Sequence, residues 1–231
     1  MIKFQTPIEG PIFIGRSWEE YIKMFNLDLN QLQNKKILDC AAGASSFTSF
    51  MSKSGFNAMA ADLLYDRNPK FLQSRCEEHL NALIDSLAKM EKEFVWSFFK
   101  NLDELKHHRM AACKDFNNDY QLNKGKKYLM ADLQQLPFAD DNFDLVLCAH
   151  LLFIYDHRLD FNFHQKAVEE MIRVSSEEVR IYPLVKNKGK KSIFVEKIRD
   201  NLPENIKTEI VRVDYQFRRG GNEMLRLIKE I

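Results

Sequence analysis

The spacing of hydrophobic residues changes repeatedly along the chain, and each change marks the start of an expected helix or strand. Ser17 with Glu20 three residues later forms a capping box, so a short helix is expected to begin there. Further helices are expected near Ser45, around Ala167 and at 193–202. Short apolar runs predict strands between them, at 36–41, 55–61, 127–131, 143–149 and 179–184. Alternating strands and helices predict an α/β protein with a doubly wound, mostly parallel sheet.

Two regions depart from this simple alternation. Residues 67–123 show mostly helical spacing, continued by Phe94, Phe98 and Leu102, and lie between the second and third expected strands. A connection of that length exceeds a crossover with one helix, so we expect a single domain over 1–231 with an inserted helical cap at 67–123. Near the end, strands at 208–217 and 222–228 flank Arg218-Arg219-Gly220-Gly221, which predicts a hairpin with a short turn.

Composition narrows the class of protein. Of 231 residues, 45% are hydrophobic and 29% charged, with a formal net charge of +1, so no overall field attracts nucleic acid or membrane. The longest apolar run is shorter than the roughly 20 residues that cross a bilayer. The start of the chain lacks the pattern of a secretion signal, and the four cysteines show no CxxC spacing. We therefore expect a cytoplasmic protein with reduced thiols and no metal centre.

Three segments with candidate chemistry follow three successive strands. In a doubly wound sheet, a nucleotide-like ligand binds beyond the carboxyl ends of the strands. The first segment, Asp39-Cys40-Ala41-Ala42-Gly43, has an acid followed by small residues that let the backbone approach a ligand. Asp62 closes the second strand, where a carboxylate can accept both ribose hydroxyls, with Asp66 as a competitor for that role. The third segment is Ala131-Asp132-Leu133.

Taken in this order, the three segments resemble the cofactor-binding loops of class I S-adenosylmethionine-dependent methyltransferases. The resemblance implies a seven-stranded, Rossmann-like mixed sheet that ends in an antiparallel hairpin, and S-adenosyl-L-methionine as cofactor. It places the adenosine at Asp62, Leu63, Asp132 and Leu133, and the methionine part at the first loop and the N-terminal region. For the methionine part of the cofactor and for the end of the fourth strand, the resemblance implies binding residues at Asp39, Ala41, Gly43, Arg16, Tyr21, Cys148 and Ala149.

The first loop departs from the family pattern, because Ala41 and Ser45 stand where two of three glycines are usual. This departure leaves open a module that binds the cofactor without catalysis or serves in regulation. A dinucleotide-dependent dehydrogenase is disfavoured, since the glycine fingerprint is missing and the chain ends in a hairpin.

Transfer of the activated methyl group is an in-line displacement that needs alignment and, for some acceptors, a base. His150 and Tyr155 follow the fourth strand and are the candidate catalytic residues, although a histidine beside an apolar run is more often a hydrogen-bonded packing residue. Three histidines recur every seven residues, but they need not share a face, so a metal is not expected.

The same region bears on the acceptor. The segment at 148–151 lacks the Asn/Asp-Pro-Pro-aromatic signature of adenine or glutamine methylation, and no proline precedes Cys148 as in cytosine-5 methyltransferases. We expect a small-molecule acceptor, with an RNA or protein methyltransferase as the alternative. A lysine-rich loop with Lys186, Lys188, Lys190 and Lys191 either attracts an anionic acceptor or RNA, or is simply solvated. Aromatic residues at 94–99 can line a pocket, pack the cap or form a homodimer surface.

Overall fold

A seven-stranded mixed sheet forms the centre of the computed structural model, which describes residues 10–186 and 189–230. The strand order is β3-β2-β1-β4-β5-β7-β6. Strands β1 to β5 run parallel, whereas β7 is antiparallel to both β5 and β6. This confirms the expected fold class, including its antiparallel end. The strands are β1 (Lys36–Cys40), β2 (Asn57–Asp62), β3 (Tyr128–Met130), β4 (Phe143–Ala149), β5 (Ser175–Tyr182), β6 (Ile206–Arg212) and β7 (Glu223–Lys229).

Helices cover both faces of the sheet because its central strands are apolar on both sides. On one face, Val146 and Cys148 of β4 pack in a cluster with residues of α5 (Phe161–Val174) and α6 (Phe194–Asp200). On the other face, Leu145 and Leu147 pack with α1 (Trp18–Met24) and α2 (Phe47–Lys53). The capping box expected at the start of α1 is present, with both hydrogen bonds formed between Ser17 and Glu20. None of the helices described is both long and apolar enough to span a bilayer.

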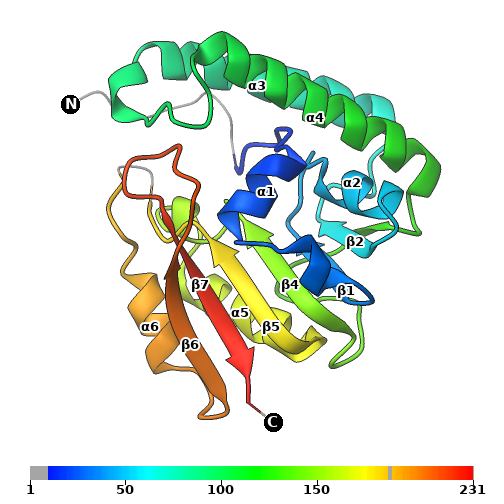
Figure 1. The fold of residues 1–231 in the computed structure, drawn as a ribbon, viewed down its shortest axis with the longest axis vertical. Coiled ribbons are helices and arrows are strands. Elements are labelled where there is room, and N and C mark those ends of the chain that lie inside the picture. Colours follow the sequence, from blue (N-terminus) through cyan, green and yellow to red (C-terminus); the bar gives the residue numbers. More distant parts are fainter. Residues whose placement is uncertain (1–9, 187–188, 231) are drawn as a thin grey trace.

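The residues between β2 and β3 form two long, paired helices, α3 (Pro69–Ala88) and α4 (Leu102–Asn123). Asn68 caps α3 and Asn101 caps α4, each accepting a hydrogen bond from a backbone N–H of the first turn. Figure 1 shows both helices lying across the end of the molecule toward which β4 and β5 point. We call residues 67–123 the helical segment. Leu83 and Leu87 of α3 and Leu105 of α4 line a cavity together with residues at the carboxyl ends of the strands.

Two expectations from the sequence were wrong, one about the helical segment and one about the connection in the terminal hairpin. Residues 94–101 do not continue a helix, because α3 ends at Ala88 and a short 3-10 turn (Glu91–Glu93) follows. The predicted turn at Arg218–Gly221 does form, because the Gly221 N–H donates to the Arg218 carbonyl at 2.8 Å, but it does not join the two strands directly. The strand β6 already ends at Arg212, and residues 213–222 form a long connection to β7. Both deviations have one cause, since the Val95 N–H donates to the carbonyl of Phe217 at 2.8 Å and the Phe94 and Phe217 rings stack at 4.9 Å. Tertiary pairing therefore overrides the local pattern.

Element boundaries shift elsewhere by a few residues. The fifth strand begins at Ser175, directly after α5, rather than at 179, and β2 begins at Asn57 after a turn at Gly55. The first strand ends at Cys40, because Ala41 already adopts a left-handed conformation.

A buried ion pair joins the helical segment to the rest of the protein. Glu20 of α1 is fully buried and forms a two-pronged pair with Arg109 of α4, whose Nη2 lies 2.7 Å from Oε1. The Tyr215 hydroxyl, from the connection before β7, donates to the same carboxylate. Burial opposes the charge of Glu20, but Arg109 outweighs it and lowers the pKa of the carboxyl. Three parts of the chain therefore meet at one carboxylate.

Close packing at Gly15 reinforces this junction. Arg109 also donates to the Gly15 carbonyl at 3.1 Å. A Cβ atom on Gly15 would lie 2.5 Å from the Cys113 nitrogen of α4, nearer than real Cβ contacts come. Glycine is therefore required where the N-terminal segment crosses α4.

We predict that Glu20→Gln lowers the free energy of unfolding by about 3 kcal/mol or more, because it leaves the Arg109 charge buried without its counter-ion. Glu19→Gln is the matched control, since Glu19 is the half-buried neighbour on the same turn. Guanidinium unfolding of both variants measures the difference. Equal stability of the two variants would show that the pair does not hold the helical segment in place.

Candidate functional site

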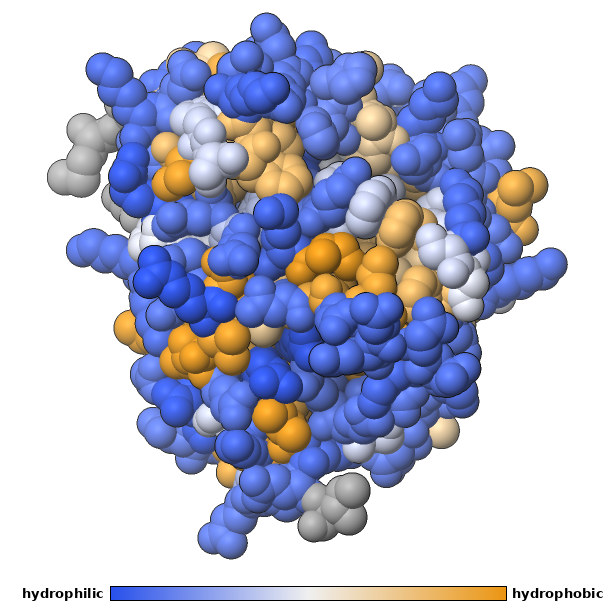
Figure 2. All heavy atoms as spheres, in the orientation of Figure 1, coloured by the Kyte–Doolittle hydropathy of each residue, from blue (hydrophilic) through white to orange (hydrophobic). Residues whose placement is uncertain are grey.

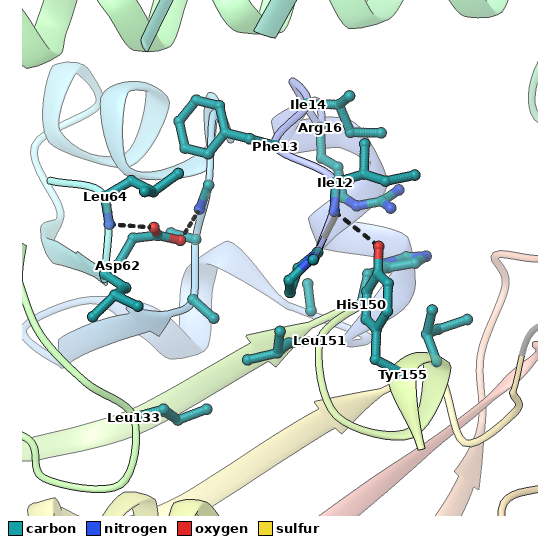
Figure 3. Close-up of a pocket in the computed structure, with 18 of the residues that line it drawn as sticks. Ile12, Phe13, Ile14, Arg16, Asp62, Leu64, Leu133, His150, Leu151 and Tyr155 are labelled. Atoms are coloured by element: carbon teal, nitrogen blue, oxygen red, sulfur yellow. Dashed lines mark hydrogen bonds between the residues drawn. The ribbon is translucent and has the colours of Figure 1, made fainter. Parts of the chain in front are cut away.

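A cavity of about 460 Å³ lies between the carboxyl ends of the strands and the helical segment. Its volume is within the usual range for small-molecule sites, about 300–1,000 Å³. Figure 3 shows Asp62 and Leu133 on one side of it and Arg16, His150 and Tyr155 on the other. Most of the residues singled out from the sequence line this cavity: Arg16, Tyr21, Ala41, Gly43, Asp62, Leu63, Asp132, Leu133, Ala149, His150 and Tyr155.

The loop after β1 turns sharply beneath the cavity. Ala41 and Gly43 both have positive φ, 51° and 59°, although this conformation is costly for alanine. A Cβ atom on Gly43 would meet the Phe13 ring at 3.8 Å and nothing nearer, so the loop backbone is open toward the cavity. The loop thus keeps the glycine-like shape of a ligand-binding turn although only one glycine remains.

Asp62 ties the loops after β1 and β2 together at the cavity wall. Its Oδ2 accepts a hydrogen bond from the Gly43 N–H at 3.0 Å, and its Oδ1 accepts one from the Leu64 N–H at 2.9 Å (Figure 3). Burial raises the pKa of this carboxyl, while the two N–H donors act in the opposite direction. Each oxygen retains a free lone pair, so the carboxylate can still accept from a diol. Asp66, the competing acid, is exposed, pairs with Arg67 and lies outside the lining.

The loop after β3 forms the neighbouring wall. Asp132 is exposed, and its Oδ1 accepts a hydrogen bond from the Gln134 N–H at 2.9 Å. Leu133 is buried against the hydrophobic core, and Leu63 from the loop after β2 is 62% exposed. A flat ring between these two leucines would have an acid at one edge.

Two residues predicted to bind the cofactor do not reach the cavity. Cys148 is completely buried in the core of the sheet. Asp39 is also completely buried, and its Oδ1 accepts a hydrogen bond from the Tyr21 hydroxyl at 3.2 Å. The other oxygen, Oδ2, has no hydrogen-bond partner among the described residues. Burial raises the pKa of Asp39 well above its ordinary value. Asp39 therefore supports the cavity floor through Tyr21, which does line it.

His150 lies at the opposite end, directly after β4. Its backbone has a φ of 57°, and its N–H donates to the Tyr182 carbonyl at 2.7 Å. The ring packs edge-on against Tyr182, and Nδ1 is buried without a partner in the described chain. Burial lowers the pKa of His150 well below its ordinary value, and Arg16, Arg109 and Arg218 lower it further. The imidazole is therefore neutral at physiological pH, and its unprotonated ring nitrogen can accept a hydrogen bond.

Arg16 lines the cavity beside His150 (Figure 3). Within the described residues its guanidinium has no hydrogen-bond partner, and burial followed by repulsion from Arg109 lowers its pKa. A guanidinium without a hydrogen-bond partner in the protein can hold a carboxylate with two parallel hydrogen bonds.

The N-terminal segment 10–15 crosses over the cavity, which the sequence did not predict. The Tyr155 hydroxyl accepts a hydrogen bond from the Ile12 N–H at 2.9 Å, and His79 Nδ1 of α3 accepts one from the Phe13 N–H at 2.8 Å. Tyr155, expected as a catalytic residue, thus holds this segment in place. The run Ile12-Phe13-Ile14 between two glycines was the available signal, because so apolar a segment needs a covering partner.

Other candidates lie away from the cavity. Lys186, Lys190 and Lys191 are not part of its lining, Lys191 is near Glu196 and Glu223, and Lys188 falls outside the described residues. Over residues 10–186 and 189–230, no cluster of histidine, cysteine and acidic side chains is suited to a metal ion.

Comparison with known proteins agrees with the fold and the loops. A family model described as a methyltransferase domain matches residues 104–182, which include β3, β4 and β5. Together with the strand order and the loops after β1, β2 and β3, this match supports the class I S-adenosylmethionine-dependent methyltransferase superfamily, whose members use S-adenosylmethionine as cofactor.

A curated relative gives the particular family. The uncharacterized protein MJ0045 of Methanocaldococcus jannaschii is 37% identical over 219 residues, covering 94% of this chain and 96% of the relative. The chain belongs to the same family as this archaeal protein.

Solved structures resemble the chain more distantly. The magnesium protoporphyrin IX methyltransferase of Synechocystis PCC 6803 with bound SAH is 12% identical, with a TM-score of 0.47, over 87% of this chain and 78% of its own. A SAM-dependent methyltransferase of Aquifex aeolicus is 15% identical, with a TM-score of 0.40, over 91% and 92%. The assignment to the superfamily therefore rests on the family model, the strand order and the loops.

We predict that His150 stays neutral as the pH falls from 8 to 6, because protonation would place a further charge among buried arginines. The ring proton resonances of His150, assigned by their absence in His150→Gln, should not shift over this range. A titration midpoint near the ordinary histidine value of about 6.5 would contradict the described burial.

Proposed function

We propose that the protein transfers a methyl group from S-adenosylmethionine to a small-molecule acceptor bound in the same cavity. The observation that carries this proposal is the position of Asp62, whose carboxylate faces the cavity while it joins the loops after β1 and β2. That is the place at which a doubly wound sheet binds a ribose.

The lining residues divide into two groups that fit the two ends of the cofactor. Asp62 would accept the ribose hydroxyls, and the exposed Asp132 with the backbone N–H of Leu133 would pair with the adenine edge. At the other end, Arg16 would hold the carboxylate of the methionine part. The open backbone at Gly43 supports this fit, because it lies at the loop that the methionine part would follow.

When bound, the cofactor supplies an activated methyl group on a positively charged sulfur. The chain's contribution is to align the acceptor and to keep water away, and the segment 10–15 covers the cavity for that purpose. His150 follows β4 at the end of the cavity away from Asp62, and its neutral ring would orient the acceptor through a hydrogen bond, because its low pKa makes it a weak base.

A small-molecule acceptor agrees with the shape of the cavity. Its lining continues past His150 to Phe217 and Arg218 of the connection before β7, so space remains beyond the residues assigned to the cofactor. This extension favours catalysis over a module that binds the cofactor alone. The cover formed by α3, α4 and segment 10–15 favours a small acceptor over a polymer.

We predict that Asp62→Asn weakens binding of S-adenosylhomocysteine at least about tenfold, because a charge-assisted hydrogen bond contributes about 1.5–3 kcal/mol. Isothermal titration calorimetry measures the dissociation constants. Asp66→Asn is the matched control and should bind like the unaltered protein, since Asp66 lies outside the lining.

Absence of binding by the folded, unaltered protein would overturn the proposed function. Equal dissociation constants for Asp62→Asn and Asp66→Asn would refute the role of Asp62, while binding by the unaltered protein would still support the proposed function.

A further inference from the structure

Two segments outside the basic sheet and its helices meet at one end of the cavity. Phe94 follows the short turn after α3, and Phe217 belongs to the long connection between β6 and β7. Their rings stack with centroids 4.9 Å apart, and both line the cavity. We call the part of the cavity lined by Leu83, Leu87, Phe94, Leu105 and Phe217 the apolar end. Its wall comes from the helical segment and this connection, not from the loops that were assigned to the cofactor.

Hydrocarbon side chains make up that wall. Leu83 and Leu87 of α3 and Leu105 of α4 belong with the two rings to one hydrophobic cluster. Leu87, Leu105 and Phe94 are buried, whereas Leu83 and Phe217 are half-buried. Leu83 and Phe217 therefore keep apolar surface that a ligand can cover. Covering it favours a ligand with an apolar body.

The arginines near the apolar end are already engaged within the protein. Arg109 is held in the buried ion pair described above. Arg158 is exposed, and its Nη1 donates to the Gly10 carbonyl at 2.9 Å. The guanidinium of Arg218 lies over the Phe94 ring, 5.2 Å from its centroid. Their charges therefore select no ionic partner for the cavity.

A charged body would also find no acidic counter-ion at the apolar end. Among the described residues that line the cavity, the acids are Asp62 and Asp132, and both follow strands on the β2–β3 side. Arg16 is assigned to the carboxylate of the cofactor. Moving an ion from water into apolar surroundings is costly unless the ion is paired there. The apolar end thus favours an uncharged ligand.

We propose that the methyl acceptor has an uncharged, mainly hydrocarbon body, such as a fused ring system, which occupies the apolar end while the accepting group faces His150. Shape and apolar contact select this body, and charge does not. This inference rests on the proposed function, because it names the substrate class for the part of the same cavity that the cofactor leaves open.

The test uses the full chain saturated with S-adenosylhomocysteine and measures probe binding by isothermal titration at neutral pH. Three probes share one ring system: neutral 2-naphthol, the anion 2-naphthoate and the cation 2-naphthylmethylammonium. We expect 2-naphthol to bind about tenfold or more tightly than either ion, because each ion loses its hydration without gaining a counter-ion. Phenol lacks the second ring and should bind about tenfold more weakly than 2-naphthol, because it buries less apolar surface.

Leu83→Gln replaces part of the apolar wall with an amide. It should weaken binding of 2-naphthol about fivefold or more and leave binding of S-adenosylhomocysteine unchanged. Ile84→Gln is the matched control, since Ile84 is the adjacent, half-buried residue of α3 and lies outside the cavity lining. This control should bind 2-naphthol like the unaltered protein.

Four outcomes overturn the inference: an ion that binds as tightly as 2-naphthol, equal binding of phenol and 2-naphthol, equal dissociation constants for 2-naphthol in the two variants, or no binding of any probe. These outcomes leave the proposed function standing, whereas failure of S-adenosylhomocysteine to bind removes the proposed function itself. If Leu83→Gln does not fold, the series of probes on the unaltered protein still decides.

Discussion

The arrangement of the cavity depends on the buried ion pair between Glu20 and Arg109. It joins α1, α4 and, through Tyr215, the connection between β6 and β7. Each of these parts contributes to the cavity wall, so a shift at the pair would move all of them. A buried pair adds little net stability compared with apolar packing, but breaking it leaves a charge without its partner. Its effect is therefore to specify how the helical segment sits on the sheet.

Around this junction the cavity is electrically asymmetric. Acids follow β2 and β3, whereas Arg16 lies beside His150 at the end of β4, and Leu83, Leu87 and Leu105 of the helical segment also line the cavity. The same arrangement lowers the pKa of His150, because burial and the nearby arginines both disfavour the protonated imidazole. Figure 2 shows the viewed face as mainly hydrophilic, with apolar patches across the middle of the molecule below α3 and α4. The cavity itself is lined by polar and apolar side chains together.

Local signals predicted the strands, the capping box and the loops with Gly43, Asp62 and Leu133, because each depends on neighbouring residues. Long-range contacts were not predictable in the same way. Glu20 and Arg109 are 89 residues apart, and nothing near either one indicates the partner. Arg218-Arg219-Gly220-Gly221 forms the turn that its composition predicts, but this turn lies within a longer connection in which Phe217 packs on Phe94. Tyr155 was a candidate for catalysis by position, whereas its hydroxyl accepts the Ile12 N–H.

The central claim is that one cavity at the carboxyl edge of the sheet holds the cofactor, with the acids at its nucleoside end. A crystal structure with S-adenosylhomocysteine bound tests this most directly. The account predicts the ribose hydroxyls at the Asp62 carboxylate, the adenine between Leu63 and Leu133, and the carboxylate of the ligand at Arg16. A ligand bound elsewhere, or in the reverse orientation with its adenine among the arginines, would contradict it.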